Sequence, residues 1–191
     1  DGSWPVVVLI ALGSAVTSAI EPILPVRLAG GLGLDAAGIG LLFALLVITG
    51  AVLNPMVGAI LGRVSPRLLA FVGAVLAVAG LMLLGIGSRL SVVIAGIDCL
   101  GAAIALLVAP ASTLIGVQGA RTEPPALGGA YSLYNLAYAA GLTLGPALAG
   151  ALTSALGYSA ACAALAIGVA VVAISGFGRL PRRLSAGATG A

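Results

Sequence analysis

The sequence predicts an all-α integral membrane protein with six transmembrane helices, arranged as two inverted three-helix repeats. Three observations predict this fold class. Of the 191 residues, 61% are hydrophobic and only 7% are charged, and the mean hydropathy is +1.27. Six apolar runs are long enough to cross a bilayer, and the second run resembles the fifth. A soluble domain carries about 25% charged residues, so a surface this poor in charge has to face lipid.

A helix needs about 20 apolar residues to cross the roughly 30 Å hydrocarbon core of a bilayer. The runs that meet this length are residues 5–28, 37–61, 68–86, 92–117, 127–156 and 160–177. Glycine, proline and most of the charge lie between them, as is typical of connections. We expect residues 1–178 to form one transmembrane domain, with repeats at about 5–86 and 92–177. Residues 179–191 are predicted to be a disordered cytoplasmic tail.

The basic residues predict the topology. All eight are arginines, and six of them fall on the side shared by both termini: Arg63, Arg67, Arg121, Arg179, Arg182 and Arg183. Only Arg27 and Arg89 fall on the other side. The positive-inside rule then places both termini in the cytoplasm of a multi-pass protein of the plasma membrane. The net charge of +3 therefore reports topology and does not indicate nucleic-acid binding.

Composition excludes several kinds of site. Histidine is absent, which excludes His metal sites, His proton relays and Ser–His catalysis. Neither Cys99 nor Cys162 has metal-ligand spacing. We therefore expect no metal and no cofactor. The high content of Ala, Gly, Leu and Arg without Lys favours a GC-rich bacterial gene.

The internal repeat lies in the second and fifth runs. "TGAVLNPMVGAILG" (49–62) aligns with "AGLTLGPALAGALT" (140–153) at an offset of 91. Gly50 then coincides with Gly141, and Pro55 with Pro146. Because three spans is an odd number, the second copy enters the membrane upside down. Inverted three-plus-three repeats are a transporter architecture.

Polar side chains form stripes inside the spans when each is placed on a helix at about 100° per residue. In the first span the stripe is Ser14, Thr17, Ser18 and Glu21, and in the fifth it is Tyr131, Tyr134, Asn135 and Tyr138. Asp98 lies in the fourth span and Asn54 in the second. Pro22 and Pro25 remove backbone donors and are expected to loosen the first helix.

We expect Glu21 and Asp98 to couple protons, because an acid at the bilayer centre costs at least ~2.5–3.5 kcal/mol and such residues usually face a cavity. An acid without a nearby cation can hold a proton and release it when a cationic compound arrives, and aromatic faces bind cations. The predicted substrate contacts are Ser14, Thr17, Ser18, Glu21, Asn54, Tyr134, Asn135 and Tyr138. Three alternatives stay open. In the first, Glu21 pairs with Arg27 near the headgroups. In the second, Asp98 is a structural acid whose polar contacts are satisfied within the protein. In the third, the tyrosines belong to an interfacial belt.

Three segments resemble a known family. "EPILP" (21–25), with Pro22 and Pro25, resembles a stretch of vesicular amine transporters and related bacterial drug–proton antiporters. Residues 128–158 resemble span eleven of the same group, with Gly141, Gly145 and Pro146 as its antiporter element. "GAILGRVSPRLL" (58–69), with Gly58, Arg63 and Arg67, is similar to the cytoplasmic loop motif of the major facilitator superfamily. The resemblance implies the C-terminal half of a twelve-helix major facilitator fold.

The chain departs from the pattern at four positions. The loop motif expects an acid at Gly62 and a glycine at Ser65, and vesicular amine transporters have aspartates where this chain has Asn135 and Val108. Only Glu21 carries over among the acids. The resemblance therefore implies an exporter of drugs or metabolites rather than an amine-specific transporter.

The predicted function is proton-coupled efflux antiport of drugs or of cationic or amphipathic metabolites, and no enzymatic activity. Its predicted partners are the lipid bilayer, protons, a small-molecule substrate, and either an N-terminal six-helix half from the same gene or a second copy. One alternative is a membrane scaffold or channel half. The other is an aspartyl-type intramembrane enzyme that uses Glu21 and Asp98.

Overall fold

The computed structural model describes residues 3–177, which form six long helices and no strand. The helices are α1 (Ser3–Leu32), α2 (Ala36–Ile60), α3 (Pro66–Ile86), α4 (Leu90–Ala120), α5 (Leu127–Leu156) and α6 (Tyr158–Phe177). All six are long and apolar enough to cross a membrane. The predicted fold class is confirmed. The prediction for residues 179–191 lies outside the described residues.

Local chemistry sets the helix ends. Asp35 precedes α2, and its carboxylate accepts a hydrogen bond from the Gly38 amide at 2.8 Å. Ser65 precedes α3 and accepts from the Leu68 amide at 3.2 Å, with Pro66 in the first turn. Such caps satisfy amides that a helix start leaves without partners. Gly157 alone connects α5 to α6, at a positive φ of 82° that favours glycine.

The helices extend further than the hydrophobic runs. α1 begins two residues before the predicted span and ends four residues after it, and it continues through Pro22 and Pro25. The prolines therefore do not end the helix, although each removes one backbone donor. α4 similarly begins at Leu90 and ends at Ala120, beyond the predicted 92–117.

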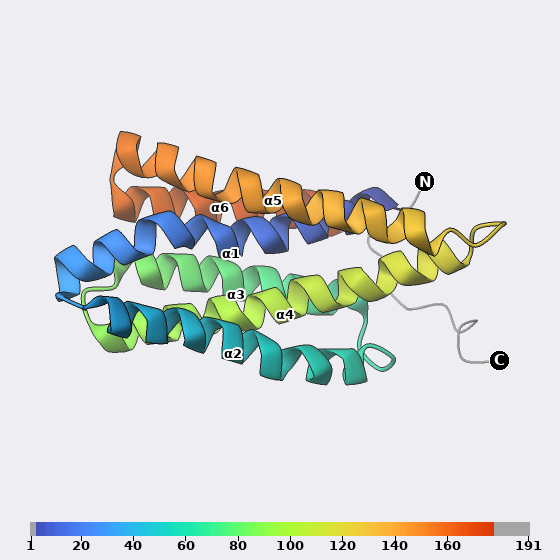
Figure 1. Ribbon diagram of the computed structural model, residues 1–191, viewed down its shortest axis with the longest axis horizontal. Coiled ribbons are helices and arrows are strands. Elements are labelled where there is room, and N and C mark those ends of the chain that lie inside the picture. The colour runs from blue at the N-terminus through green and yellow to red at the C-terminus, as the bar shows by residue number, and fades with distance from the viewer. Residues whose placement is uncertain (1–2, 178–191) are drawn as a thin grey trace.

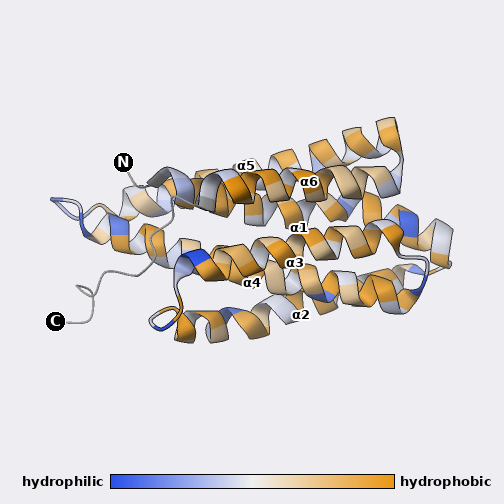
Figure 2. Ribbon diagram, turned by 180° about the vertical axis from the view of Figure 1, so that it is seen from behind, coloured by the Kyte–Doolittle hydropathy of each residue, from blue (hydrophilic) through white to orange (hydrophobic). Residues whose placement is uncertain are grey.

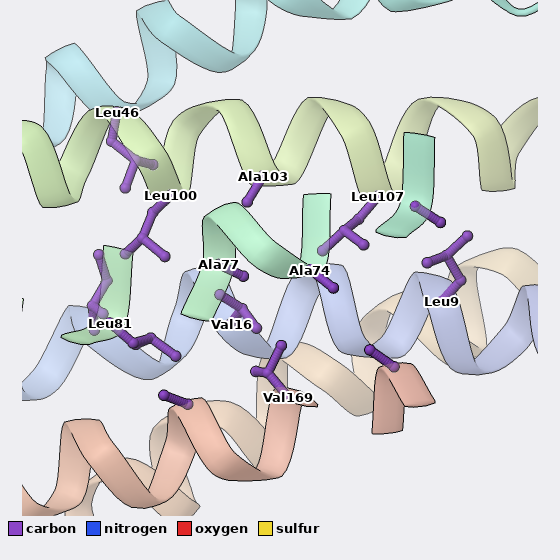
Figure 3. Packing of buried hydrophobic residues seen from close by; sticks show 14 of the residues in the cluster. Leu9, Val16, Leu46, Ala74, Ala77, Leu81, Leu100, Ala103, Leu107 and Val169 are labelled. Carbon is purple, nitrogen blue, oxygen red and sulfur yellow. The ribbon is translucent and has the colours of Figure 1, made fainter. Parts of the chain in front are cut away.

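The bundle has two layers. In Figure 1, α5, α1, α4 and α2 lie side by side in that order and form what we call the four-helix face. Seen from behind in Figure 2, α6 and α3 come to the front as a back layer. α3 packs against α4 and α6, which joins the two layers. Figure 3 shows the apolar core between them, where Val16 of α1, Ala77 and Leu81 of α3, and Val169 of α6 lie close together.

Close backbone contacts join the two predicted repeats. The second helix of each predicted repeat packs on the first helix of the other, since α2 contacts α4 and α5 contacts α1. The aligned glycines lie in these two contacts. A Cβ at Gly50 would lie 3.4 Å from the Gly101 carbonyl oxygen of α4. A Cβ at Gly141 would overlap the Ser14 hydroxyl and the Ala11 carbonyl of α1.

We predict that Gly141→Ala destabilises the bundle, because its methyl group has no space between α5 and α1. Overpacking of this kind costs about 1–3 kcal/mol. Gly150→Ala is the matched control on the same helix, since a Cβ there would meet nothing within 4 Å. Thermal unfolding of the purified chain in detergent measures both variants. Equal melting temperatures for the two would contradict the close α1–α5 approach.

Candidate functional site

Glu21 is an exposed carboxylate inside a membrane-spanning helix. It lies on α1, four residues after the partly buried Thr17, whose hydroxyl donates to the Gly13 carbonyl at 2.9 Å. Within residues 3–177, Glu21 makes no hydrogen bond and no ion pair. Arg27 instead lies over the Tyr158 ring of α6, with its guanidinium carbon 5.8 Å from the ring centroid. The structure therefore does not contain the alternative ion pair between Arg27 and Glu21.

Asp98 is held by a hydroxyl from the neighbouring helix. Thr49 of α2 donates to its carboxylate at 3.0 Å, and both side chains are partly buried. Asp98 also lies close in depth to Glu21. A Cβ at Gly13 of α1 would lie 2.9 Å from Val108 of α4, which sets the register of these antiparallel helices. Glu21 comes eight residues after Gly13, and Asp98 comes ten residues before Val108. At 1.5 Å per residue, the two acids therefore lie within about 3 Å of each other along the bundle axis.

The tyrosines of α5 form a ladder. The Tyr131 and Tyr134 rings meet edge to face with centroids 6.5 Å apart, and the Tyr134 and Tyr138 rings stack at 6.0 Å with an interplanar angle of 10°. Tyr138 remains 37% exposed, and Asn135 beside it is exposed. At the other end of the ladder, a Cβ at Gly116 of α4 would lie 3.1 Å from the Tyr131 hydroxyl. The ladder therefore faces the side where α5 approaches α4.

The structure separates the acids from the tyrosines. α1 and α5 run in the same direction, and Gly141 lies opposite Ala11 and Ser14. Tyr138 comes three residues before this contact, whereas Glu21 comes well after it. At 1.5 Å per residue, Tyr138 and Glu21 lie roughly 15 Å apart along the bundle axis. The predicted site residues thus form two groups rather than one cluster.

Ser14 and Ser18 belong to helix packing. They are only 2% and 1% exposed, and they lie where α1 meets α5. Ser14 donates to the Ile10 carbonyl at 3.1 Å, and Ser18 donates to Ser14 and, across the interface, to the Gly141 carbonyl at 3.3 Å. A substrate cannot reach these hydroxyls while the two helices stay packed. The expectation that both residues contact substrate therefore does not fit this structure.

The other predicted residues lie in four places. Asn54 and Pro55 are exposed in the C-terminal third of α2. Gly145 is buried against Ala15 and Ser18, with the partly buried Pro146 next to it. Gly58 and Arg63 are exposed and Arg67 is partly buried, at the α2–α3 connection. Pro22 is exposed and Pro25 partly buried on α1.

Sequence analysis did not single out Thr49 and Tyr158, each of which contacts a charged side chain of another helix. Thr49 is one of many hydroxyl residues in the apolar runs, and nothing in its neighbourhood points to Asp98, 49 residues later. Tyr158 is the single tyrosine outside the α5 stripe, and its ring contacts Arg27 from a different helix. Among residues 3–177, no group of three acidic or sulfur side chains is placed to hold a metal ion.

A comparison with models of protein families gives a match. The family model described as Major Facilitator Superfamily matches residues 6–190. This covers almost the whole chain and all six helices. A search of curated proteins found no match.

We predict a measurable coupling between Thr49 and Asp98. Thr49→Val keeps the shape and removes the donor, while Asp98→Ala removes the acceptor. Hydrogen bonds between helices in a membrane average about 0.6 kcal/mol in double-mutant cycles, so we expect a coupling free energy of that size. Unfolding of both single variants and the double variant in detergent measures it.

Thr143→Val is the control for the Thr49 variant, because the Thr143 hydroxyl donates only within its own helix, to Ala139. It should show no coupling to Asp98→Ala. A coupling of zero for the Thr49 pair would mean that the hydrogen bond contributes nothing to the fold.

Proposed function

The chain belongs to the major facilitator superfamily, and from this premise we propose that it is one half of a proton-coupled efflux antiporter. Members of this family transport small molecules across membranes, and the six apolar helices make the chain a multi-pass membrane protein. The proposed substrates are drugs or cationic or amphipathic metabolites. The observation that carries the proposal is the exposed Glu21 carboxylate, which has no partner among residues 3–177 although it lies within a spanning helix.

Glu21 is the proposed coupling acid. Because a charged acid in the membrane interior is costly, an unpaired one is stabilised either by a proton or by a cationic ligand. Because the tyrosine ladder lies roughly 15 Å from Glu21 along the bundle axis, we propose that helix movement, rather than direct competition, links proton uptake at Glu21 to substrate release. Asp98 differs, since Thr49 already satisfies part of its carboxylate. We therefore give Asp98 the role of joining α2 to α4 and leave proton coupling to Glu21.

The tyrosine ladder is the proposed substrate surface. Tyr134, Asn135 and Tyr138 present aromatic faces and an amide on α5, and the face of Tyr138 is partly open. Aromatic faces attract cations by about 0.5–2 kcal/mol, depending on how much water is excluded. Thr17 and Asn54, from α1 and α2, are further proposed contacts, while Ser14 and Ser18 are left out.

A second half completes the proposed transporter. The four-helix face supplies one wall of a central site, and alternating access requires another wall that moves against it. We propose that this wall is either an N-terminal six-helix half encoded by the same gene or a second copy of this chain. The proposed location is the plasma membrane with cytoplasmic termini. Consistent with this, Arg63, Arg67 and Arg121 lie at one end of the bundle, and Arg27 and Arg89 at the other.

The alternative functions predict different outcomes. A membrane scaffold or a channel half would show no proton-driven exchange. An aspartyl-type enzyme would use Glu21 and Asp98, which lie at similar depth, but the family consists of transporters. A transport assay distinguishes these possibilities.

We predict that Glu21→Gln abolishes exchange driven by a pH gradient and preserves exchange of substrate for substrate. The transporter that contains this chain is reconstituted in liposomes with ethidium, a fluorescent planar cation, as the probe. Glu123→Gln, in the exposed α4–α5 connection, is the control and should behave as the unaltered protein. Proton-driven ethidium movement by the Glu21→Gln protein would refute the coupling role. Absence of ethidium movement in the unaltered protein would refute the cationic substrate class.

We predict that Tyr138→Ala raises the KM for ethidium between about 2- and 30-fold, the range of a single cation–π contact. Tyr138→Phe keeps the ring and should change the KM little. Initial rates over a range of ethidium concentrations measure both variants in the same liposomes. If Phe and Ala raised the KM equally, the hydroxyl rather than the aromatic face would bind the substrate.

A further inference from the structure

An apolar cavity lies behind the four-helix face. It has a volume of about 260 Å³, and every side chain that lines it is apolar. Val16 and Ala19 of α1 form one wall, Leu148 of α5 a second, and Leu165 and Gly168 of α6 a third. Leu148 is 53% exposed and Gly168 is also exposed, so the cavity opens between α5 and α6.

The cavity suits hydrocarbon and not water. A water molecule in a cavity needs 2–4 polar partners, whereas an apolar cavity of about 150 Å³ in another protein stays dry and binds benzene. The present cavity is larger than that and opens at a membrane-spanning surface. The molecules that surround such a surface are lipids, and their acyl chains are the hydrocarbon within reach.

A cation lies on the same side of α1. Val16, Ala19, Ile23 and Arg27 follow one another at three- or four-residue steps, so they share one face of the helix. Ile23 and Tyr158 pack in the cluster between the cavity and the end of the bundle, and Arg27 lies above them against the Tyr158 ring. The Arg27 side chain is exposed. It extends toward Gly31, where a Cβ would lie 2.7 Å from one guanidinium nitrogen.

The spacing between cation and cavity fits one leaflet. Ala19 and Arg27 are eight residues apart, or about 12 Å along the helix. Half of the hydrocarbon core is about 15 Å thick. A long basic side chain near a helix end points toward the headgroups. Arg27 thus lies at the depth of a lipid phosphate, and the cavity at the depth of the same lipid's acyl chain.

We propose that a phospholipid binds at this place, with its phosphate on the Arg27 guanidinium and one acyl chain in the cavity between α5 and α6. The site is independent of the transport path, because the cavity is behind the face that carries Glu21 and the tyrosines. A partner half that docks on the four-helix face leaves the opening to the bilayer. The bound chain replaces packing that α5 and α6 lack there, and so stabilises their arrangement.

Two variants test the two ends of the lipid. Arg27→Gln removes the charge and leaves the cavity. Gly168→Leu fills the cavity without a backbone clash, since a Cβ at Gly168 would meet nothing within 4 Å. The matched controls are Arg89→Gln, at the same end of the bundle, and Gly150→Leu, where a Cβ also meets nothing within 4 Å.

The measurement is native mass spectrometry of the full chain, extracted in mild detergent from nanodiscs that contain phosphatidylcholine and phosphatidylglycerol at a 4:1 ratio. We expect one phosphatidylglycerol to remain bound to the unaltered chain. Arg27→Gln should lower its retention about fivefold, the effect of one basic residue near anionic lipid. Gly168→Leu should abolish retention of phosphatidylglycerol, and the two controls should retain it normally.

Two results of this experiment would contradict the lipid site. Equal losses in Arg27→Gln and Arg89→Gln would mean that phosphatidylglycerol is held only by general surface charge, and normal retention in Gly168→Leu would mean that no chain enters the cavity. Either result overturns the proposal. Circular dichroism confirms that each variant keeps its helices, and Arg27→Lys, which preserves the charge at a surface position, should restore most of the retention. Failure of that rescue would also count against a phosphate on Arg27. None of these outcomes depends on proton-driven transport.

Discussion

Close approach of helix backbones is the constraint on which this bundle depends. Lipid is as apolar as leucine, so no hydrophobic force drives one helix onto another inside a membrane, and van der Waals packing has to do so. Small residues permit that packing. A Cβ at Gly80 of α3 would lie 2.8 Å from the Gly96 carbonyl oxygen of α4, and a Cβ at Gly101 of α4 would lie 2.7 Å from the Leu46 carbonyl oxygen of α2. α4 therefore holds α3 and α2 through glycine contacts, as α1 holds α5.

This constraint also determines where polar groups lie. Once Gly141 and Gly145 bring α5 against α1, Ser14 and Ser18 are enclosed, and their hydroxyls bond to backbone carbonyls. Glu21 shares their stripe, yet it comes after the last of these glycine contacts and is exposed, although α5 still packs on α1 through Ala149 beside Ala19 and Ile23. One stripe of a helix thus has a packing function in its middle and an exposed acid near its end. The enclosed hydroxyls lie where the glycines of α5 contact α1.

The sequence predicted the six helices well, because the apolar runs and their Gly- and Pro-rich connections are determined by the membrane itself. It predicted the polar stripes but not their surroundings. The period of a helix says that Ser14, Ser18 and Glu21 share a face, and it says nothing about whether lipid, a cavity or another helix lies opposite. The Thr49–Asp98 hydrogen bond and the Arg27–Tyr158 contact were out of reach for the same reason, since each joins helices that are distant in the chain. The family resemblance added the prediction that this chain pairs with a second six-helix half, which no property of a single helix reveals.

The separation of Glu21 from the tyrosine ladder bears on how coupling works in the proposed antiporter. A proton and a substrate that bind roughly 15 Å apart along the axis do not compete by contact, so helix movement has to link them. α1 carries the acid and α5 carries the ladder, and the two are joined between these positions by the contacts of Gly141 and Gly145 and by the hydrogen bond from Ser18 to the Gly141 carbonyl. Because the two backbones are in close contact there and are joined by that hydrogen bond, we propose that α1 and α5 move together. Protonation of Glu21 that favoured one position of α1 would therefore also select the position of the tyrosines, which makes the glycine interface the element that both ligands bias.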